Sequence, residues 1–167
     1  MKSIYLAGFD VFRADAKQRG EALKRYCRDF GFVGLFPMDN ECPAGLHGQE
    51  LARWIFAANI SLIKSASCVM ANINNFRGAE PDSGTCFEIG YAAALGLPVW
   101  AYTADGRPLV EQIACTAKMD GSYQDEAGFT VENFELPRNL MLCCSAKIVI
   151  GHERDCLQAM AAHHAGV

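Results

Sequence analysis

The sequence has little that would bind nucleic acid or enter a membrane. It contains no long run of lysine and arginine and carries a formal net charge of −4 at pH 7, which disfavours nucleic acid as a partner. No segment approaches the roughly 18 consecutive apolar residues of a membrane-spanning helix. The apolar run at the start is too short for a secretory signal and ends at the acidic Asp10. We therefore expect a cytoplasmic protein that has neither nucleic acid nor a membrane as a partner.

Patterns that would bind a metal or a cofactor are also missing. The chain has eight cysteines, but no two of them have the C-x-x-C spacing. His47 and His152 are solitary, and His163 and His164 are neighbours rather than an i, i+4 pair. The loop at Gly8 has no G-x-G-x-x-G fingerprint, which argues against NAD. We expect buried thiols in a reducing compartment, no metal site and no cofactor.

Strand-like and helix-like segments alternate along the chain. Apolar runs predict strands at residues 2–7, 32–36, 67–73, 99–102 and 146–150, and helical periodicity predicts helices at residues 14–30, 49–64, 87–95 and 153–163. Parallel strands need such crossovers. We therefore predict an α/β fold with a doubly wound, parallel, five-stranded sheet, which is a three-layer sandwich of the flavodoxin or Rossmann type.

The chain length bounds the number of domains. A chain of 167 residues is long enough for one core and short for two, so we expect a single domain over residues 1–167. Residues 104–138 are the least regular part, with only a weak helical pattern at residues 108–115. We predict a mostly irregular excursion there, which would serve as a lid or an interface arm.

Two carboxylates, Asp82 and Glu88, flank the start of the third predicted helix. Pro81 and Gly84 mark a loop, and Thr85 is the predicted N-cap. Glu88 would then lie in the first turn, where free backbone N–H groups favour an ionised carboxylate. The spacing from Thr85 to Glu88 also fits a capping box, in which the glutamate only bonds back to the cap.

A pair of carboxylates has two common uses in enzymes. It can hold a divalent metal, or it can split a glycosidic bond with one carboxylate as nucleophile. The sequence has no DxD cluster beside Asp82 and Glu88, so we favour the glycosidic reaction. A sugar ester formed on Glu88 can be intercepted by a second acceptor, which gives ping-pong transfer with retained configuration.

Four stretches of the chain resemble the nucleoside 2-deoxyribosyltransferase family. In chain order they are Ile4 to Gly8, Phe36 to Glu41, Phe76 to Ala92 and Pro137 to Leu142. The resemblance implies the same α/β fold and a role in nucleoside salvage. It also implies that the sugar is 2-deoxyribose and that the partners are 2′-deoxyribonucleosides and free nucleobases.

The resemblance also implies roles for individual residues. Glu88 would attack C1′, Asp82 would hold the sugar hydroxyls, and the hydroxyl of Tyr5 would orient the nucleophilic carboxylate. Asn139 would reach into a neighbouring subunit near the 5′-hydroxyl, which implies a dimer-based homo-oligomer. The alternatives are a core tyrosine at Tyr5 and a helix N-cap at Asn139.

Further residues are predicted to bind the substrate. Gly8 opens a loop at the carboxyl end of the first strand, where open α/β sheets bind ligands, and Gly84 flanks the two acids. Asp39 is predicted to contact the leaving base, unless it only closes an Asx turn, and Asn72 is its neutral alternative. Phe9 offers a stacking surface for the base, although core packing would explain it as well.

Arg77 has several possible partners, namely the base, a phosphate, or Glu80 in a surface ion pair. Two other functions also remain open. One is hydrolysis of a deoxynucleoside 5′-monophosphate, and the other is a non-catalytic module that senses nucleotides. A phosphate pocket needs more donors than the loop at Gly8 provides, and carboxylates already occupy the third helix start. We therefore favour a free nucleoside as the substrate.

Overall fold

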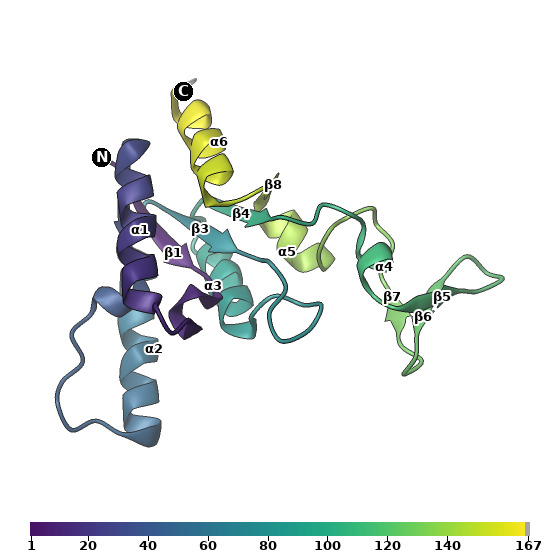
Figure 1. Ribbon diagram of the computed structural model, residues 1–167, viewed down its shortest axis with the longest axis horizontal. Helices are drawn as coiled ribbons and strands as arrows, with labels where there is room; N and C mark the ends of the chain where they lie inside the picture. Colours follow the sequence, from purple (N-terminus) through teal and green to yellow (C-terminus); the bar gives the residue numbers. More distant parts are fainter. Residues whose placement is uncertain (166–167) are drawn as a thin grey trace.

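The fold confirms the predicted doubly wound parallel sheet. The computed structural model describes residues 1–165, and Figure 1 shows the sheet at the centre of the molecule. The five parallel strands stand in the order β2-β1-β3-β4-β8. Their bounds are β1 Ser3–Ala7, β2 Val33–Leu35, β3 Cys68–Asn72, β4 Val99–Thr103 and β8 Lys147–Ile150. Strand β1 therefore pairs with a neighbour on both edges.

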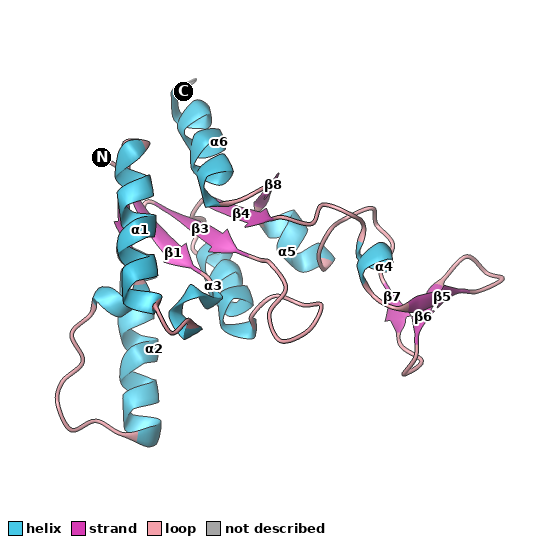
Figure 2. Ribbon diagram, in the orientation of Figure 1, coloured by secondary structure: helices cyan, strands magenta, loops and turns pink. Residues whose placement is uncertain are grey.

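Helices cover both faces of this sheet, as Figure 2 shows. The principal helices are α1 Ala16–Asp29, α2 Gly48–Ser65, α3 Ser83–Ala94, α5 Leu140–Ser145 and α6 Glu153–Ala165. Helices α1 and α6 share one hydrophobic core with the sheet, and α2, α3 and α5 share the other. The result is the three-layer sandwich that the sequence predicted.

The two cores divide the side chains of each strand by alternation, because successive residues of a strand point to opposite faces. In β1, Ile4 and Leu6 face helices α1 and α6. Tyr5 and Ala7 face helices α2, α3 and α5. Every residue of β3 and β4 is buried, as expected for central parallel strands. The alternation directs the side chain of Tyr5 toward the layer that contains α3.

The chain reverses its direction of winding between β1 and β3, which places a crevice at the carboxyl ends of these strands. Two short 3-10 helices, η1 Phe9–Phe12 and η2 Pro37–Asp39, follow β1 and β2 at this edge. Gly8 joins β1 to η1 with a φ angle of 153°, and a Cβ atom there would lie 2.8 Å from the Cβ of Asn72. Only glycine therefore lets this loop pass so close to β3.

Residues 104–138, which we call the arm, are mostly irregular, as predicted, but they also contain short strands that the sequence did not indicate. The arm contains helix α4 Leu109–Gln112 and an antiparallel sheet of β5 Cys115–Ala117, β6 Tyr123–Asp125 and β7 Thr130–Val131. The weak helical pattern is confirmed by α4, but the strands have two or three residues each, too few to show a periodicity. Figure 1 shows the small sheet standing well apart from the main one.

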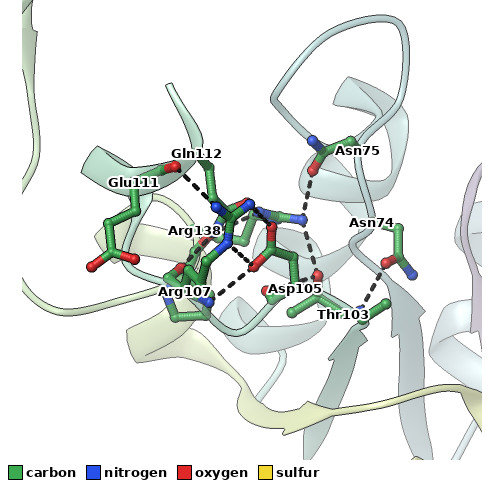
Figure 3. A network of polar contacts seen from close by, with 10 residues as sticks. Asn74, Asn75, Thr103, Asp105, Arg107, Glu111, Gln112 and Arg138 are labelled. Atoms are coloured by element: carbon green, nitrogen blue, oxygen red, sulfur yellow. Dashed lines mark hydrogen bonds and ion pairs between the residues drawn. The ribbon is translucent and has the colours of Figure 1, made fainter. Parts of the chain in front are cut away.

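Arg138 fixes the base of the arm to the main sheet. Its side chain is 1% exposed, and its guanidinium donates only to neutral acceptors, as Figure 3 shows. The acceptors are the carbonyl oxygens of Ile73 and Pro137 and the side chains of Asn75, Thr103 and Gln112. They belong to the ends of β3 and β4 and to the arm, including its helix α4. One buried cation therefore joins the arm to two strands of the main sheet.

The cysteines are unpaired, but the expectation that they are buried is wrong in part. Cys27, Cys68 and Cys156 are buried, whereas Cys42 and Cys144 are exposed. Burial raises the pKa of Cys27 to about 12, which makes its thiol unreactive. Within residues 1–165, no group of three or more His, Cys, Asp and Glu side chains could hold a metal ion. No described helix has the length and apolar character needed to cross a membrane.

Candidate active site

A cavity of about 840 Å³ opens at the carboxyl edge of the sheet, beside the crevice between β1 and β3. Its wall combines the loop of Gly8 and Phe12, the segment of Asp39 to Cys42, one face of α2 and the start of α3. Glu88 lies in this wall together with Asp82. A volume of this size is in the range of small-molecule sites.

The hydroxyl of Tyr5 donates a 2.5 Å hydrogen bond to Oε1 of Glu88. Tyr5 is fully buried in β1, and Glu88 projects from α3, which packs on the same face of the sheet. The strand thus supplies a rigid donor, and the helix supplies the carboxylate that faces the cavity. This geometry matches the orienting role that the resemblance implied for Tyr5.

Asp82 is the N-cap of α3, so the prediction that Thr85 caps this helix is wrong. Oδ2 of Asp82 accepts hydrogen bonds from the backbone N of Thr85 at 2.9 Å and from its hydroxyl at 3.0 Å. The helix begins at Ser83, and Glu88 therefore lies in its second turn. The capping-box alternative also fails, because Glu88 bonds to Tyr5 and not to the cap. Both cap bonds use one oxygen of Asp82, and its other oxygen is not needed for the cap.

Burial raises the pKa of Glu88 to about 7, against the hydrogen bond from Tyr5, which lowers it. The negative charge of Asp82 raises this pKa further. The prediction that the helix start holds Glu88 ionised is therefore wrong, because desolvation dominates in the second turn. Burial and the adjacent Glu88 together raise the pKa of Tyr5 well above its usual range. Tyr5 thus remains a hydroxyl donor at neutral pH.

The rest of the cavity wall is largely apolar. Phe12 and Met38 come from the loops after β1 and β2, and Leu51, Trp54 and Ile55 come from α2. Leu51 and Ile55 are four residues apart and share one face of the helix. Aromatic and aliphatic side chains thus form one side of the cavity, and the carboxylates of Asp82 and Glu88 lie on the side of α3.

Comparison with known proteins identifies the family to which this fold belongs. A profile of the family described as nucleoside 2-deoxyribosyltransferase matches residues 4–141. The chain belongs to this family.

Three proteins that are similar to this nucleoside 2-deoxyribosyltransferase family member cover most of its length. An uncharacterised protein of Schizosaccharomyces pombe is 30% identical in an alignment 157 residues long, which covers 83% of this chain and 74% of that protein. The structure of a 2-desoxiribosyltransferase from Leishmania mexicana is 33% identical, with a TM-score of 0.78 over 98% of this chain and 99% of that one. A CMP N-glycosidase from Clostridium botulinum shares the fold at 17% identity and a TM-score of 0.51, over 96% and 99% of the two chains.

In this nucleoside 2-deoxyribosyltransferase fold, five of the predicted site residues meet at the cavity. They are Gly8, Asp39, Asp82, Gly84 and Glu88. Tyr5 lies directly behind Glu88 through their hydrogen bond. The carboxylate of Asp39 accepts hydrogen bonds from Lys24 at 2.6 Å and from the backbone N of Phe36 at 3.0 Å. Asp39 therefore closes the turn that follows β2 and lines the cavity as well.

Phe9 and Arg77 take part in an aromatic stack beside the cavity. The ring of Phe9 stacks on Phe76 at 5.2 Å, and Phe76 stacks on Phe12 at 5.3 Å. The guanidinium of Arg77 lies over Phe76 at 4.6 Å and over Phe12 at 5.4 Å. Of the three rings, Phe12 is the one in the cavity wall. A cation–π contact therefore takes the place of the ion pair that we considered for Arg77.

Asn72 and Asn139 are engaged elsewhere in the chain. Asn72 is 5% exposed and donates to Asp10 at 3.0 Å, which places it behind Gly8. Asn139 is the N-cap of α5, where it accepts from the backbone N of Met141 and donates to Glu132 at 2.7 Å. Within residues 1–165, the cavity wall includes neither of these asparagines.

Sequence reasoning missed several residues of the wall, including Phe12, Asn40, Trp54 and Asn59. Phe12 is in the loop whose other aromatic residue, Phe9, was selected for stacking. Trp54 lies among the other apolar residues of α2, and no local pattern distinguishes it from them. The missing information was the approach of the loop after β2 to α2, which is a tertiary contact without a local pattern.

Proposed function

We propose that this protein transfers 2-deoxyribose from a 2′-deoxyribonucleoside to a second nucleobase through an ester on Glu88. The observation that carries the proposal is the hydrogen bond between Tyr5 and Glu88 in the wall of a cavity that also contains Asp82. The bond fixes one carboxylate oxygen and leaves the other for attack. The family to which the chain belongs supports the choice of deoxyribose.

The reaction follows the double displacement of retaining glycosyl transfer. The carboxylate of Glu88 attacks C1′, the bond from C1′ to the base nitrogen breaks, and the base leaves with the bonding electrons and takes up a proton. A ring nitrogen of the incoming base then attacks C1′, releases the carboxylate and loses its proton. Because the sugar has no 2′-hydroxyl, the cationic transition state is less destabilised, and a positioned anion supplies most of what the reaction needs.

Two further carboxylates have roles in this proposal. Asp82 stands next to Glu88 in the wall and holds the sugar hydroxyls with the oxygen that the helix cap does not use. Asp39 contacts the base from the opposite loop. Because Gly8 and Gly84 have no side chain, the sugar can approach the backbone closely at both positions.

The charge of the wall favours a nucleoside over a nucleotide. Asp39, Glu41, Asp82 and Glu88 are acidic, and Lys17 is the single basic residue in the wall of this cavity as described for residues 1–165. A 5′-phosphate would add negative charge to an already negative site. Hydrolysis of a nucleoside monophosphate, the activity named for the Clostridium botulinum relative, is therefore the less favoured alternative.

A second protomer completes the site in this proposal. Aromatic side chains gather on α2 and α3, where the exposed Phe56 lies 5.9 Å from the exposed Phe87 and Phe87 lies 6.0 Å from the half-buried Tyr91. We call these three residues the aromatic cluster. It gives a second copy an apolar surface to pack against. Asn139 then exchanges its bond to Glu132 for the 5′-hydroxyl in the neighbouring site.

The test is an assay of the purified protein with deoxyinosine, deoxyadenosine or thymidine, with and without adenine or cytosine. We expect a new deoxynucleoside to appear only when a second base is present, and mass spectrometry of the quenched enzyme to place a deoxyribosyl group on Glu88. Glu88→Ala should lose turnover, while Glu126→Ala, on the exposed arm, should keep it. Release of free base at the same rate without an acceptor indicates a hydrolase. Ligand binding without turnover indicates a sensing module.

A further inference from the structure

The short helix η1 buries a charged residue beneath the cavity wall. Among the four residues of η1, only Asp10 is buried, and it lies outside the wall that its neighbours Val11 and Phe12 help to form. Oδ1 of Asp10 accepts a hydrogen bond from Nε of Arg19 at 2.9 Å, and Oδ2 accepts one from Nδ2 of Asn72 at 3.0 Å. Donors from α1 and β3 therefore hold both oxygens of this carboxylate.

Arg19 connects the carboxylate of Asp10 to the last helix of the chain. Its Nη1 donates to Oε1 of Glu153, in the first turn of α6, at 2.9 Å. The side chains of Arg19, Asp10 and Glu153 are only 20%, 6% and 16% exposed. Burial alone would lower the pKa of Arg19, but its hydrogen bonds to Glu153 and Asp10 raise that pKa above the usual value. One charged guanidinium therefore serves two carboxylates from different elements.

Helix η1 has little other support from the regular elements. Four residues form little more than one turn of a 3-10 helix, and so short a run is not stable on its own. Phe9 and Phe12 stack on Phe76, which itself belongs to a loop. Asp10 instead connects η1 to a long helix and a central strand. The place of η1 in the cavity wall therefore depends on how firmly this carboxylate is held.

We propose that Arg19 is a positioning residue of the active site, which holds Asp10 in place and thereby keeps η1 in the cavity wall. The inference rests on the proposed function and adds to that site a residue that does not line the cavity. A guanidinium suits this role because its planar fork can donate to two carboxylates at once, whereas the ammonium of a lysine is a point charge. Without the cation, Asp10 and Glu153 are two buried negative charges without compensation, which should displace η1 toward solvent.

Amide hydrogen exchange tests the support of η1 directly and needs no ligand. Arg19→Met removes the cation at similar length. The matched control is Asp29→Asn, which breaks the pair of Asp29 with Arg154 at 3.3 Å. That pair also joins α1 to α6, but at the end of α1 that is far from η1. Mass spectrometry should show exchange of residues 8–13 about tenfold faster in Arg19→Met and unchanged in the control.

Steady-state kinetics test the consequence for the active site. Because the bond between Tyr5 and Glu88 does not involve η1, the reacting group stays in place when η1 moves. Arg19→Met should therefore raise the KM for deoxyinosine about tenfold, while kcat stays within about threefold of the wild type. A merely structural role would give the reverse, because a smaller folded fraction lowers the apparent kcat and leaves KM unchanged. Asp29→Asn should change neither constant.

Arg19→Lys is the second variant, and it keeps the cation in case circular dichroism shows that Arg19→Met does not fold. A lysine cannot bridge both carboxylates, so its KM and its exchange rate at residues 8–13 should lie between those of the wild type and Arg19→Met. Exchange at the wild-type rate in both folded variants would overturn the inference, and so would an unchanged KM in variants whose η1 exchanges faster. A wild type that transfers no sugar refutes the proposed function, and the exchange experiment then decides alone whether Arg19 holds η1.

Discussion

The hydroxyl of Tyr5, on the central strand β1, donates to the carboxylate of Glu88, 83 residues later on α3. Two opposing effects act on the pKa of Glu88. Burial raises the pKa of Glu88 to about 7, and the hydrogen bond from Tyr5 restrains that rise. Because a nucleophilic carboxylate must be ionised, the balance between the two effects sets the pH at which the proposed enzyme becomes active.

Tyr5→Phe should move the pH dependence of transfer toward higher pH. In the wild type, kcat/KM should rise with pH through about 7 as Glu88 ionises. Without the hydroxyl the ionised form loses a charge-assisted hydrogen bond, and the acidic limb should shift upward by about one pH unit. Steady-state measurement of kcat/KM between pH 5 and 9 provides the profile. Tyr26→Phe, on α1 and the other face of the sheet, is the control, and identical limbs in both variants would contradict the assigned role.

Glu88→Gln should stabilise the fold at alkaline pH. The folded pKa of Glu88 is raised from 4.5 to about 7, so the unfolded chain loses this proton first and stability falls as pH rises from 4.5 to about 7. A neutral glutamine escapes that loss and still accepts from Tyr5. Urea unfolding should show the variant more stable by roughly 2 kcal/mol at pH 8, and similar to the wild type near pH 4.5. A difference in stability that does not depend on pH would contradict the ionisation of Glu88 as its cause. Glu126→Gln, on the exposed arm, serves as the control.

Asp82→Ser should separate helix capping from catalysis. Serine caps helices about as well as aspartate does, so the hydroxyl can replace Oδ2 in the bonds to Thr85. We expect the free energy of unfolding to stay within about 0.5 kcal/mol of the wild type. Transfer should fall at least about a hundredfold, because the carboxylate that holds the sugar is gone. Asp82→Ala should lose about 1 kcal/mol of stability in addition. Full activity in the serine variant would limit Asp82 to capping.

Arg138→Met should destabilise the protein by about 3 kcal/mol or more, because it leaves the buried acceptors of Figure 3 without a donor. The matched control is Arg107→Met. Arg107 pairs with Asp105 at the surface with 59% of its side chain exposed, so its loss should have little effect on the free energy of unfolding. Urea unfolding compares the two variants. Limited proteolysis should also cut the arm faster in Arg138→Met, and equal effects of the two variants would contradict the bracing role.

Phe87→Glu should disrupt the proposed assembly. Phe87 is 51% exposed at the centre of the aromatic cluster, and a charge at that position would have to be desolvated in an interface. Sedimentation should show a smaller species than the wild type, and transfer should fall because Asn139 no longer reaches a neighbouring site. Phe129→Glu, 71% exposed on the arm, is the control for an added charge. An unchanged mass with unchanged activity would place the interface elsewhere.

The main sheet could be predicted from the sequence because its signals are local. The central strands are uniformly apolar, and glycine or proline ends most elements. The start of α3 was harder, because Asp82 and Thr85 are both good N-caps three residues apart. The backbone decides between them, since Asp82 is extended with φ −61° and ψ 130° and the helix begins immediately after it.

The pKa of Glu88 could not be predicted from the sequence either. From the sequence, the helix start favours an ionised carboxylate and hence a lowered pKa. The tertiary contact with β1 buries Glu88 and raises its pKa instead. The choice of Phe9 for stacking has a similar origin, because the loop is too short for a pattern to show which ring faces the cavity. Phe12 lines the cavity, while Phe9 packs on Phe76.

Strand β1 is hydrogen-bonded to β2 on one edge and to β3 on the other. Residues in such a position open only when the whole fold opens, so the backbone amide protons of this strand should be among the slowest to exchange with solvent. Tyr5 belongs to this strand, so its hydroxyl should keep the proposed nucleophile oriented until the whole protein unfolds. Heat should inactivate the protein only at the temperature at which it unfolds.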